Sequence, residues 1–587
     1  MSPSTSGWPR KSCSSAGRTS MLLAATALTE FWGDGAILRL GPWCKSERGR
    51  RAPDPWADRA RLHAACGGAQ ELLERLLPEL GAGLSALHGE KLPPEYWKVL
   101  LAPWLSRFIH LVWDRYERLR LAFEAEPGLD AVLLDEADFT TARGLQHFQD
   151  LGFSDEYNLQ IISQLIDLQR QDFPRRCLTR PAPEFPDRTR PCGARALDAA
   201  VRAASPRILV AELFPRRAQN VRLLARLAGK AGPFLGALPP PPAADLARRA
   251  KLTIARKGAG PEAAVRALLA RHVPTLYVEG FATARAATRS GWRRAPDVLV
   301  SSTGWLFDEA FKFAAAEFSL SGTTRVGWQH GGGYGVDLDT PTESLERLLV
   351  DRFVTWGWTS DAPGAKTVPL PNPHIEDFRA RGLSAGPRRD LLFVTNGFPL
   401  FPYLLYNWPI GWQVEDDFER QRRFILALPE AARKALVLRL YPLERGWNAR
   451  ERIESGLPAM RRDNSGSMAG ALSRAKLAVF DHVGTSFSEA LAHGTPTMAL
   501  RNPAVSPFRP EAEPLAARLK EAGLLYDSPD EAAKAAARLL PDVTTWWEGA
   551  AARGAREAWL TSHGRSGDWS APWADFLNGL IRAAASS

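Results

Sequence analysis

The strongest constraint on the fold is a repeated alternation between short apolar segments and longer helical ones. Nearly continuous apolar strands separated by helices are typical of a parallel sheet that is covered on both faces. The sequence therefore predicts an α/β protein with two Rossmann-like domains that face a cleft, together with additional helices. The first series of expected strands is 36–41, 131–139, 208–213, 275–280, 297–302, 325–328 and 353–358, and the second is 391–396, 435–442, 477–481, 497–500 and 524–527.

The length of the chain and its proline-rich segments predict the domain boundaries. A chain of 587 residues is longer than one hydrophobic core can organise. Residues 361–385 are rich in Pro and polar side chains, which is typical of a linker between domains. We expect residues 21–360 to form an N-terminal, acceptor-side domain with a helical insertion and a Pro-rich loop near 229–245. Residues 386–587 are expected to form the nucleotide-donor domain, and the Ser-rich residues 1–20 a disordered tail or an over-long start of the reading frame.

The composition narrows the class of function. Apolar residues make up 45% and charged residues 24%, and no run reaches the ~18 apolar residues that span a bilayer. The net charge of +10 favours phosphate-bearing ligands or an anionic membrane surface, and no nucleic-acid-binding pattern is present. The five cysteines are scattered without a CxxC pair, which fits a reducing cytoplasm. A short apolar stretch after Arg18 leaves a secretion signal as the alternative.

The motif GWQHGGGYG, residues 327–335, is the first candidate site. It follows an apolar strand and breaks into a glycine turn that begins with His330. Loops after strand carboxyl ends are where open parallel sheets bind ligands, and three successive glycines suit a positive φ or a close backbone approach by a ligand. A histidine there could act as a general base. The alternative is a tight turn whose glycines serve only packing.

The second candidate site is DHVGTSFSEALAHGTPTMAL, residues 481–500. It is expected to form a strand, a polar loop, a helix and a further strand. The N–H groups at the helix start could bind a phosphate, and Glu489 could accept hydrogen bonds from ribose or sugar hydroxyls. His482 is a further candidate phosphate contact. The alternative is that Thr485 or Ser486 caps the helix and that Glu489 closes a capping box.

Other short patterns carry less information. The Asp337-Leu-Asp339 motif has the form of a metal-binding pair in some nucleotide-sugar enzymes, but a solvated loop is the expected explanation. GAGPEA, residues 258–263, lacks the preceding strand that a dinucleotide fingerprint needs. His110 lies in a mostly apolar helical run and is expected to be a core residue. We therefore predict no metal site and no cofactor other than a nucleotide-activated donor, which is a substrate.

Taken together in chain order, several motifs resemble a known family. The matching segments are TALTEFWGDGAILRLGPWC, YWKVLLAPWLSRFIHLVWDRYERL, LYVEGF, GWQHGGGYG, FVTWGW, GTSFSEALAHGTP and the Trp546-Trp547 pair. The chain resembles a transferase family of O-antigen and surface-polysaccharide biosynthesis. That family is assigned to the two-domain GT-B fold and is distantly similar to enzymes that use cytidine-activated glycerol phosphate or acidic sugars. The chain departs from the family at Pro42, where a glutamate is expected.

The resemblance implies a function and assigns roles to residues. It makes the protein a cytoplasmic transferase, expected to be a glycosyltransferase that transfers from a nucleotide-activated donor to a glycan or lipid-linked acceptor, with the inner membrane surface as a further place of action. Transfer of a polyol phosphate, or nucleotide or glycan binding without catalysis, are the alternatives. His330 is then the catalytic base. The substrate-binding candidates are Trp328, Gln329, Gly331, Gly332, Gly333, Tyr334 and Glu279, and the donor-binding candidates are Asp481, His482, Gly484, Thr485, Ser486 and Glu489.

Overall fold

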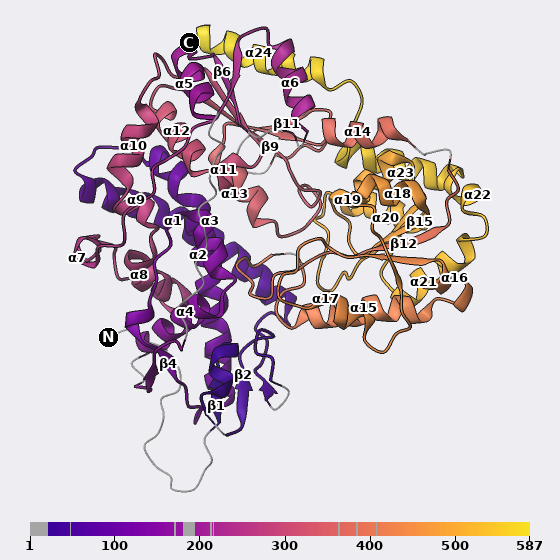
Figure 1. The fold of residues 1–587 in the computed structure, drawn as a ribbon, viewed down its shortest axis with the longest axis horizontal. Coiled ribbons are helices and arrows are strands. Elements are labelled where there is room, and N and C mark those ends of the chain that lie inside the picture. Colours follow the sequence, from indigo (N-terminus) through magenta and orange to yellow (C-terminus); the bar gives the residue numbers. More distant parts are fainter. Residues whose placement is uncertain are drawn as a thin grey trace.

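A computed structural model gives the architecture of the chain. It describes residues 21–586 except 34, 47–48, 170–171, 180–193, 212–213, 215, 362–363, 365, 383–385 and 407. The predicted tail, 1–20, lies outside the described residues. Figure 1 shows two lobes: one is coloured indigo through salmon and carries the yellow C-terminal helix, and the other is mostly orange to yellow. Each lobe contains a parallel sheet together with helices, which confirms the predicted α/β class.

The first lobe contains a six-stranded, wholly parallel sheet in the order β11-β10-β9-β8-β6-β7. The chain order reverses between β6 and β8, so this sheet is doubly wound. Helices α5 to α13 connect or cover its strands. The strands are β6 (Ile208–Val210), β7 (Ala231–Pro233), β8 (Val298–Ser301), β9 (Thr324–Trp328), β10 (Arg352–Thr355) and β11 (Lys366–Pro369). The helices are α5 (Ala194–Ala204), α6 (Arg217–Arg226), α7 (Leu246–Arg249), α8 (Gly260–His272), α9 (Thr275–Val278), α10 (Phe281–Arg289), α11 (Gly304–Phe307), α12 (Glu309–Ser319) and α13 (Pro341–Leu349).

The second lobe contains another six-stranded parallel sheet, in the order β14-β13-β12-β15-β16-β17. In chain order this is 3-2-1-4-5-6, the Rossmann arrangement, and ligands of such sheets bind outside the carboxyl ends of the strands where the order reverses, here β12 and β15. The strands are β12 (Asp390–Val394), β13 (Leu436–Arg439), β14 (Arg461–Arg462), β15 (Ala475–Phe480), β16 (Thr497–Leu500) and β17 (Leu525–Tyr526). The helices are α14 (Pro373–Arg381), α15 (Gln413–Ala427), α16 (Glu430–Lys434), α17 (Ala449–Glu454), α18 (Met468–Arg474), α19 (Thr485–His493), α20 (Glu513–Glu521), α21 (Pro529–Leu539), α22 (Val543–Trp547) and α23 (Ala550–His563).

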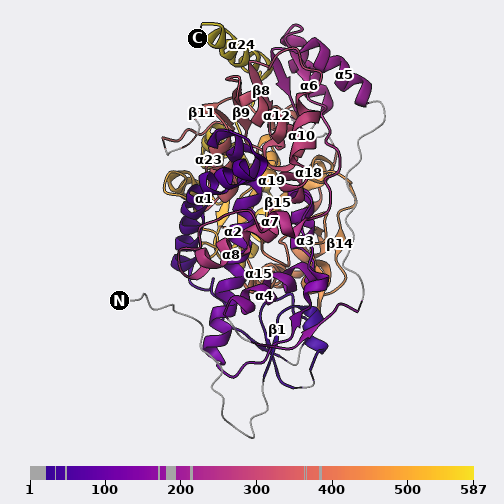
Figure 2. The ribbon, with the colours of Figure 1, turned by 90° about the vertical axis from the view of Figure 1, so that its left-hand side faces the viewer.

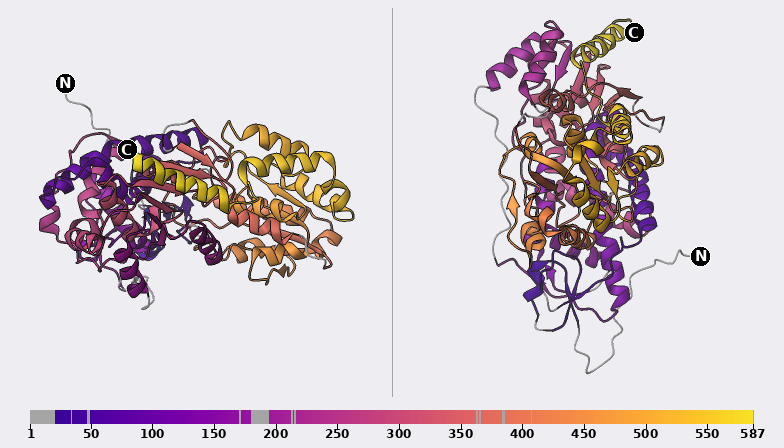
Figure 3. Two further views of the ribbon diagram at one scale, coloured as in Figure 1. Left: turned by 90° about the horizontal axis from the view of Figure 1, so that it is seen from above. Right: turned by 90° about the vertical axis from the view of Figure 1, so that its right-hand side faces the viewer.

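The strand β12 shows why the second sheet needs helices on both faces. Leu391 and Phe393 belong to the apolar cluster on one face, while Leu392 and Val394 belong to the cluster on the other. Successive side chains of a strand point to opposite faces, so a fully apolar strand has to be covered twice. Helices α15 and α21 lie together on one face, and α19 packs with α14 and α23 on the other (Figure 3).

The first lobe carries an N-terminal layer that the first sheet does not include. Two long helices, α1 (Arg59–His88) and α2 (Pro94–Ala125), pack on one another, and α2 also packs on α12 and α8 (Figure 2). His110 of α2 is buried and accepts a hydrogen bond from Leu405 N, which confirms the prediction of a core residue. Of the helices described, none combines the length and the apolar character that crossing a bilayer requires. The remaining elements are β1 (Leu22–Ala24), β2 (Ile37–Arg39), β3 (Arg50–Arg51), β4 (Leu133–Leu134), α3 (Leu145–Gly152), α4 (Asp155–Leu168) and β5 (Arg175–Arg176).

The last helix, α24 (Ser570–Ser586), returns to the first lobe (Figure 1). Trp573, Leu577 and Ile581 are buried against the apolar face of β6, β8, β9 and β10. Burying a Leu or Ile side chain stabilises a fold by about 1.5–3 kcal/mol. The packing of α24 therefore binds the end of the chain to the first lobe. The expectation that 386–587 forms only the second domain differs from this arrangement.

The connection between the lobes also differs from the predicted linker. Within 361–385, β11 pairs with β10 as the edge strand of the first sheet, and α14 packs against α19 of the second lobe. Its Pro residues start a helix here, because Pro373 occupies the first position of α14, where a missing N–H costs nothing. The described part of this segment therefore holds a strand of the first sheet and a helix that packs on the second lobe.

Three expected segments in the first lobe were wrong in detail. Residues 275–280 form the helix α9 instead of a strand, because short buried apolar runs do not reveal their secondary structure and Pro274 caps the helix start. The expected strand at 131–139 shrinks to β4 and a 3-10 turn, Glu136–Asp138. The expected loop near 229–245 contains β7, an edge strand of the first sheet.

Candidate active site

The side chain of Gln329 holds the glycine turn after β9 in place through hydrogen bonds. This side chain is completely buried, accepts hydrogen bonds from Trp356 N (3.0 Å) and Trp358 Nε1 (2.8 Å), and donates one to Gly331 O (2.8 Å). Trp328 is also buried and packs in the cluster beneath α24. Both residues were predicted to bind substrate. Their hydrogen bonds and burial instead favour a role in holding the next residue, His330, at the carboxyl end of β9.

His330 pairs with a buried carboxylate from α13. Its Nδ1 lies 3.1 Å from Glu346 Oε1, and its side chain keeps 29% of its surface exposed while Glu346 keeps 1%. The hydroxyl of Tyr334 donates to the same carboxylate oxygen at 3.0 Å. Burial lowers the pKa of His330, but the negative charge of Glu346 and its close polar contact together outweigh burial, so the pKa lies above its usual value. A neutral imidazole oriented in this way is a suitable general base through its Nε2.

The glycines of the turn are explained by close approach of protein atoms. A Cβ on Gly332 would lie 2.4 Å from Thr485 N, and a Cβ on Gly333 would lie 2.4 Å from Asp337 Oδ2. Within the motif only Gly335 has a positive φ, 75°. Gly331 has room, because an added Cβ would meet only Tyr334 at 3.9 Å. Gly332 therefore has to be glycine because the two lobes meet there.

The start of α19 lies directly opposite this turn. Gly332 N donates a hydrogen bond to Thr485 Oγ1 at 2.9 Å, across the boundary between the lobes. The residue that precedes the helix is Gly484, and no side chain caps the helix. The alternative, in which Thr485 or Ser486 caps the helix and Glu489 closes a capping box, is therefore wrong. No side chain satisfies the first N–H groups of α19, and N–H groups of this kind can bind an anion.

A hydrogen-bonded cluster surrounds the carboxyl end of β15. Asp481 Oδ1 lies 2.6 Å from His482 Nδ1, and both carboxylate oxygens accept from Asn396 N, at 3.0 and 2.9 Å. Gln421 Nε2 donates to Asp481 and to Asp417, both at 2.9 Å. Burial, and then the charge of Asp481, raise the pKa of Asp417 to about 8. The cluster joins the ends of β12 and β15, where the strand order reverses.

Glu489 lies one turn further along α19 and faces the crossing between the lobes. Its Oε1 lies 2.6 Å from Nε2 of His374, the second residue of α14. The Glu489 side chain is 8% exposed and that of His374 is 22% exposed. Glu489 therefore pairs with His374 and does not cap the start of α19.

Three acidic residues that the sequence singled out, Glu279, Asp337 and Asp339, form ion pairs. Glu279 is buried and pairs with Arg249 at 2.7 Å, and it also accepts from Asp245 N, which favours a structural role over substrate binding. Asp337 is buried, bonds with Arg501 (2.9 Å) and accepts from Trp408 Nε1 (3.0 Å). Asp339 pairs with Arg59 and His63. The expectation of a solvated loop at 337–339 was therefore wrong, because both carboxylates are buried and paired.

Several polar partners at the site did not stand out in the sequence. Glu346 and His374 are distant in the chain from the residues they contact, and Asn396, Asp417 and Gln421 belong to ordinary strand-end and helix patterns. Only Asn396 had a usable signal, because it follows the first strand of the second Rossmann series. Within the described ranges, no three His, Cys, Asp or Glu side chains cluster in a way that could hold a metal ion.

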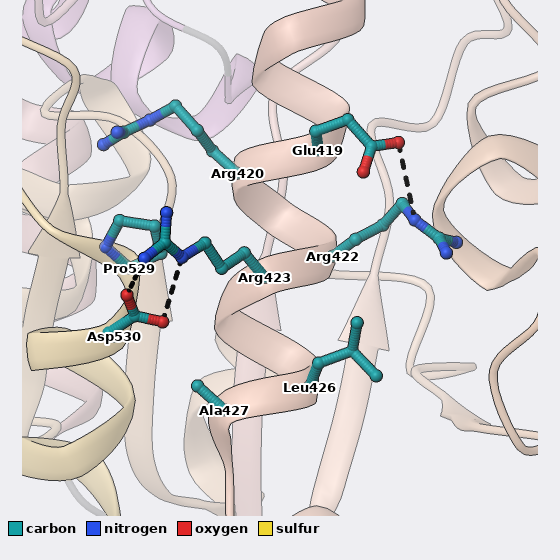
Figure 4. A pocket seen from close by; sticks show the side chains of 8 residues that line it. All are labelled: Glu419, Arg420, Arg422, Arg423, Leu426, Ala427, Pro529 and Asp530. Atoms are coloured by element: carbon teal, nitrogen blue, oxygen red, sulfur yellow. Dashed lines mark hydrogen bonds and ion pairs between the residues drawn. The ribbon is translucent and has the colours of Figure 1, made fainter.

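Two surface cavities lie away from these residues. One, of about 520 Å³, is bounded by α15 and the start of α21, and Figure 4 shows Arg423 paired with Asp530 inside it. The other, of about 640 Å³, lies between β2–β3 and α15–α17. The predicted site residues line neither cavity. The candidate chemistry therefore rests on the contact between the glycine turn and the start of α19, and not on either cavity.

The fold and the facing strand ends define the class of protein. Two parallel, Rossmann-like sheets with their ligand-binding ends in contact, and a last helix that returns to the first lobe, make up the GT-B architecture of transferases. The chain belongs to the LIC12162 family of transferases, whose model matches residues 21–577. Both findings confirm the predicted GT-B transferase.

Solved structures resemble the chain only at low levels. A complex of S. aureus MnaA with UDP has 11% identity and a TM-score of 0.37, and the match covers 65% of this chain and 97% of that one. MurG from Acinetobacter baumannii has 12% identity and a TM-score of 0.32, over 63% and 99%. A variant of the wall teichoic acid polymerase TagF soaked with CDPG has 11% identity and a TM-score of 0.33, over 67% and 94%. No curated protein matches the sequence.

Proposed function

We propose that the protein transfers a sugar from a nucleotide-activated donor to a hydroxyl of a surface-glycan acceptor, which is either a glycan or a lipid-linked sugar. The observation that carries the proposal is the hydrogen bond of 2.9 Å between Gly332 N and Thr485 Oγ1. It joins a histidine turn of one lobe to an uncapped helix start of the other. A base and an anion-binding helix end are the two groups that this reaction needs at one point.

On the acceptor side, His330 serves as the base. Glu346 faces Nδ1, so the neutral imidazole keeps its proton on Nδ1 and presents Nε2 to the acceptor hydroxyl. As Nε2 takes the proton, the hydroxyl oxygen forms a bond to the anomeric carbon. The bond between that carbon and the nucleotide phosphate oxygen breaks, and its electrons leave with the phosphate.

On the donor side, the phosphate is proposed to bind at the N-terminus of α19. The N–H groups that follow Gly484 supply partial positive charge, and His482 lies beside them, because a Cβ on Gly484 would meet its ring at 2.8 Å. These groups stabilise the negative charge that develops as the donor bond breaks. Glu489 accepts a hydrogen bond from a donor hydroxyl.

Substitution of His330 by Ala tests the assignment. We expect the variant to lose at least about 100-fold in transfer, the usual contribution of a general base, while it keeps its melting temperature and nucleotide binding. Binding can be followed by the rise in melting temperature with UDP, CDP, GDP or CMP, because a ligand at 100 times its Kd adds about 2.7 kcal/mol of stability. The same screen identifies the donor nucleotide.

His63 provides the matched control in the same lobe, since its side chain is 57% exposed. His63→Ala should leave transfer unchanged. Near-normal turnover in His330→Ala with the identified donor would disprove the role of His330 as base.

A further inference from the structure

Glu489 has an unusual environment for a nearly buried carboxylate. Its side chain is 8% exposed, and among the described residues its partner is His374 and no Lys or Arg pairs with it. Within the same part of the chain only Oε1 receives a hydrogen bond, at 2.6 Å, which leaves Oε2 as the oxygen that can accept from a ligand. A carboxylate in this position depends on a single neighbour for its orientation.

His374 is itself held rigidly. Asn372, the N-cap of α14, accepts hydrogen bonds from His374 N (2.8 Å) and Ile375 N (3.4 Å). The imidazole packs edge-on against Phe378, with 5.2 Å between the ring centres. The backbone and the ring are both fixed, so Nε2 points at Glu489 in a defined direction.

The helix that carries His374 is attached to the first lobe. Gln219 of α6 donates to Pro373 O and to Asp377, both at 2.8 Å, and Arg216 pairs with Asp377 at 3.0 Å. The same helix packs on α19, which carries Glu489. The contact of 2.6 Å therefore links Glu489 to a helix that both lobes hold.

We propose that His374 is a positioning residue, which orients Glu489 so that its free oxygen accepts a hydrogen bond from a ribose hydroxyl of the donor nucleotide. The proposal rests on the proposed function for the placement of the donor phosphate at the start of α19. Glu489 lies one turn, about 5.4 Å, along the same helix from this phosphate position. A hydrogen bond to a carboxylate contributes most when the acceptor is held in place before binding.

The test is a binding experiment that does not depend on turnover. Affinities of wild type, His374→Ala and His374→Gln are measured by calorimetry for UDP and CDP and for their 2′,3′-dideoxy forms. We expect wild type to prefer the ribonucleotides, and His374→Ala to lose about tenfold in affinity for them, equivalent to about 1.4 kcal/mol. Its affinity for the dideoxy forms should stay unchanged. His374→Gln, whose amide can still donate, should restore most of the loss.

His493 provides a matched control on the same helix, because its Nδ1 bonds to Thr495 and not to Glu489. His493→Gln should keep the preference for ribonucleotides. Glu489→Gln should abolish that preference, and adding His374→Ala to it should have no further effect, since coupled residues are not additive.

Two results would overturn the proposal. One is an equal loss in His374→Ala for ribose and dideoxy forms, which would indicate a purely structural role. The other is a wild type with no preference between these forms. If His330 is not the catalytic base, all of these affinities can still be measured. Failure of the proposed function and failure of this inference can therefore be told apart.

Discussion

Two histidines follow the carboxyl ends of facing strands, and each has a carboxylate at its Nδ1. At the end of β9, His330 pairs with Glu346, which comes from α13 and is also held by Tyr334. At the end of β15, His482 pairs with its own neighbour, Asp481, which is held by the backbone of β12 and by Gln421. The first pair is assembled from separate elements, whereas the second is built into one strand end.

This difference fits two kinds of task. The carboxylate of Glu346 is completely buried, so its charge acts on the imidazole with little screening by water, and it raises the pKa of His330 against the effect of burial. The Asp481 pair lies beside an uncapped helix start, where the imidazole adds a donor to a row of backbone N–H groups. The first pair suits proton transfer, and the second suits the binding of phosphate.

Among the substitutions that test this comparison, Glu346→Gln should cause the largest loss of transfer. The amide can donate to His330 Nδ1, which would place the ring proton on Nε2 and remove the base. We expect transfer to fall by about 1,000-fold, within the range that misdirected histidine tautomers cause. Nucleotide affinity should remain normal, and calorimetry beside steady-state kinetics separates the two quantities.

The pH dependence of this variant gives a second check. In wild type, activity should fall as the pH drops through the raised pKa of His330, because the protonated ring cannot accept a proton. Without the charge of Glu346, burial and Arg107 both lower this pKa, so the acid limb of any residual activity should move to lower pH. An unchanged or upward-moving limb would contradict the proposed pairing.

The contact between the glycine turn and the start of α19 can be disrupted by adding one methyl group to Gly332. A Cβ on Gly332 would lie 2.4 Å from Thr485 N, and the backbone there cannot move aside without separating the lobes. We expect Gly332→Ala to lose about 100-fold in transfer, because misplacing reacting groups by about 1 Å costs that much. Each lobe keeps its own core, so the melting temperature should change little.

Gly331→Ala is the control for this steric argument. The added Cβ would meet only Tyr334 at 3.9 Å, an ordinary contact. This variant should therefore lose much less transfer than Gly332→Ala. Equal losses in both variants would show that the turn needs glycine for reasons other than contact with α19.

The same comparison explains what the sequence could predict. Five of the six strands of the second sheet were predicted, all except β14, because their apolar runs are bounded by helix or turn signals, and Asp481 and His482 are visible as neighbours. His330 was visible as the residue between a strand and three glycines. Its partner Glu346 was not, because a buried pair between elements leaves no pattern in a helix such as α13. Residues 275–280 were wrongly predicted as a strand for a related reason, since four buried residues carry no period.

Asp481→Asn should have the smallest effect and should act on binding. Every neighbour of this carboxylate other than His482 is a donor, so the new amide group can point only toward His482 Nδ1. His482 would then donate from Nε2, and the negative charge of the carboxylate beside its ring would be lost. Charge-assisted hydrogen bonds are about twice as strong as neutral ones, so we expect UDP or CDP to bind roughly three- to tenfold more weakly. Titration calorimetry measures this affinity, and a variant that binds as tightly as wild type would remove His482 from the phosphate site while leaving the role of His330 intact.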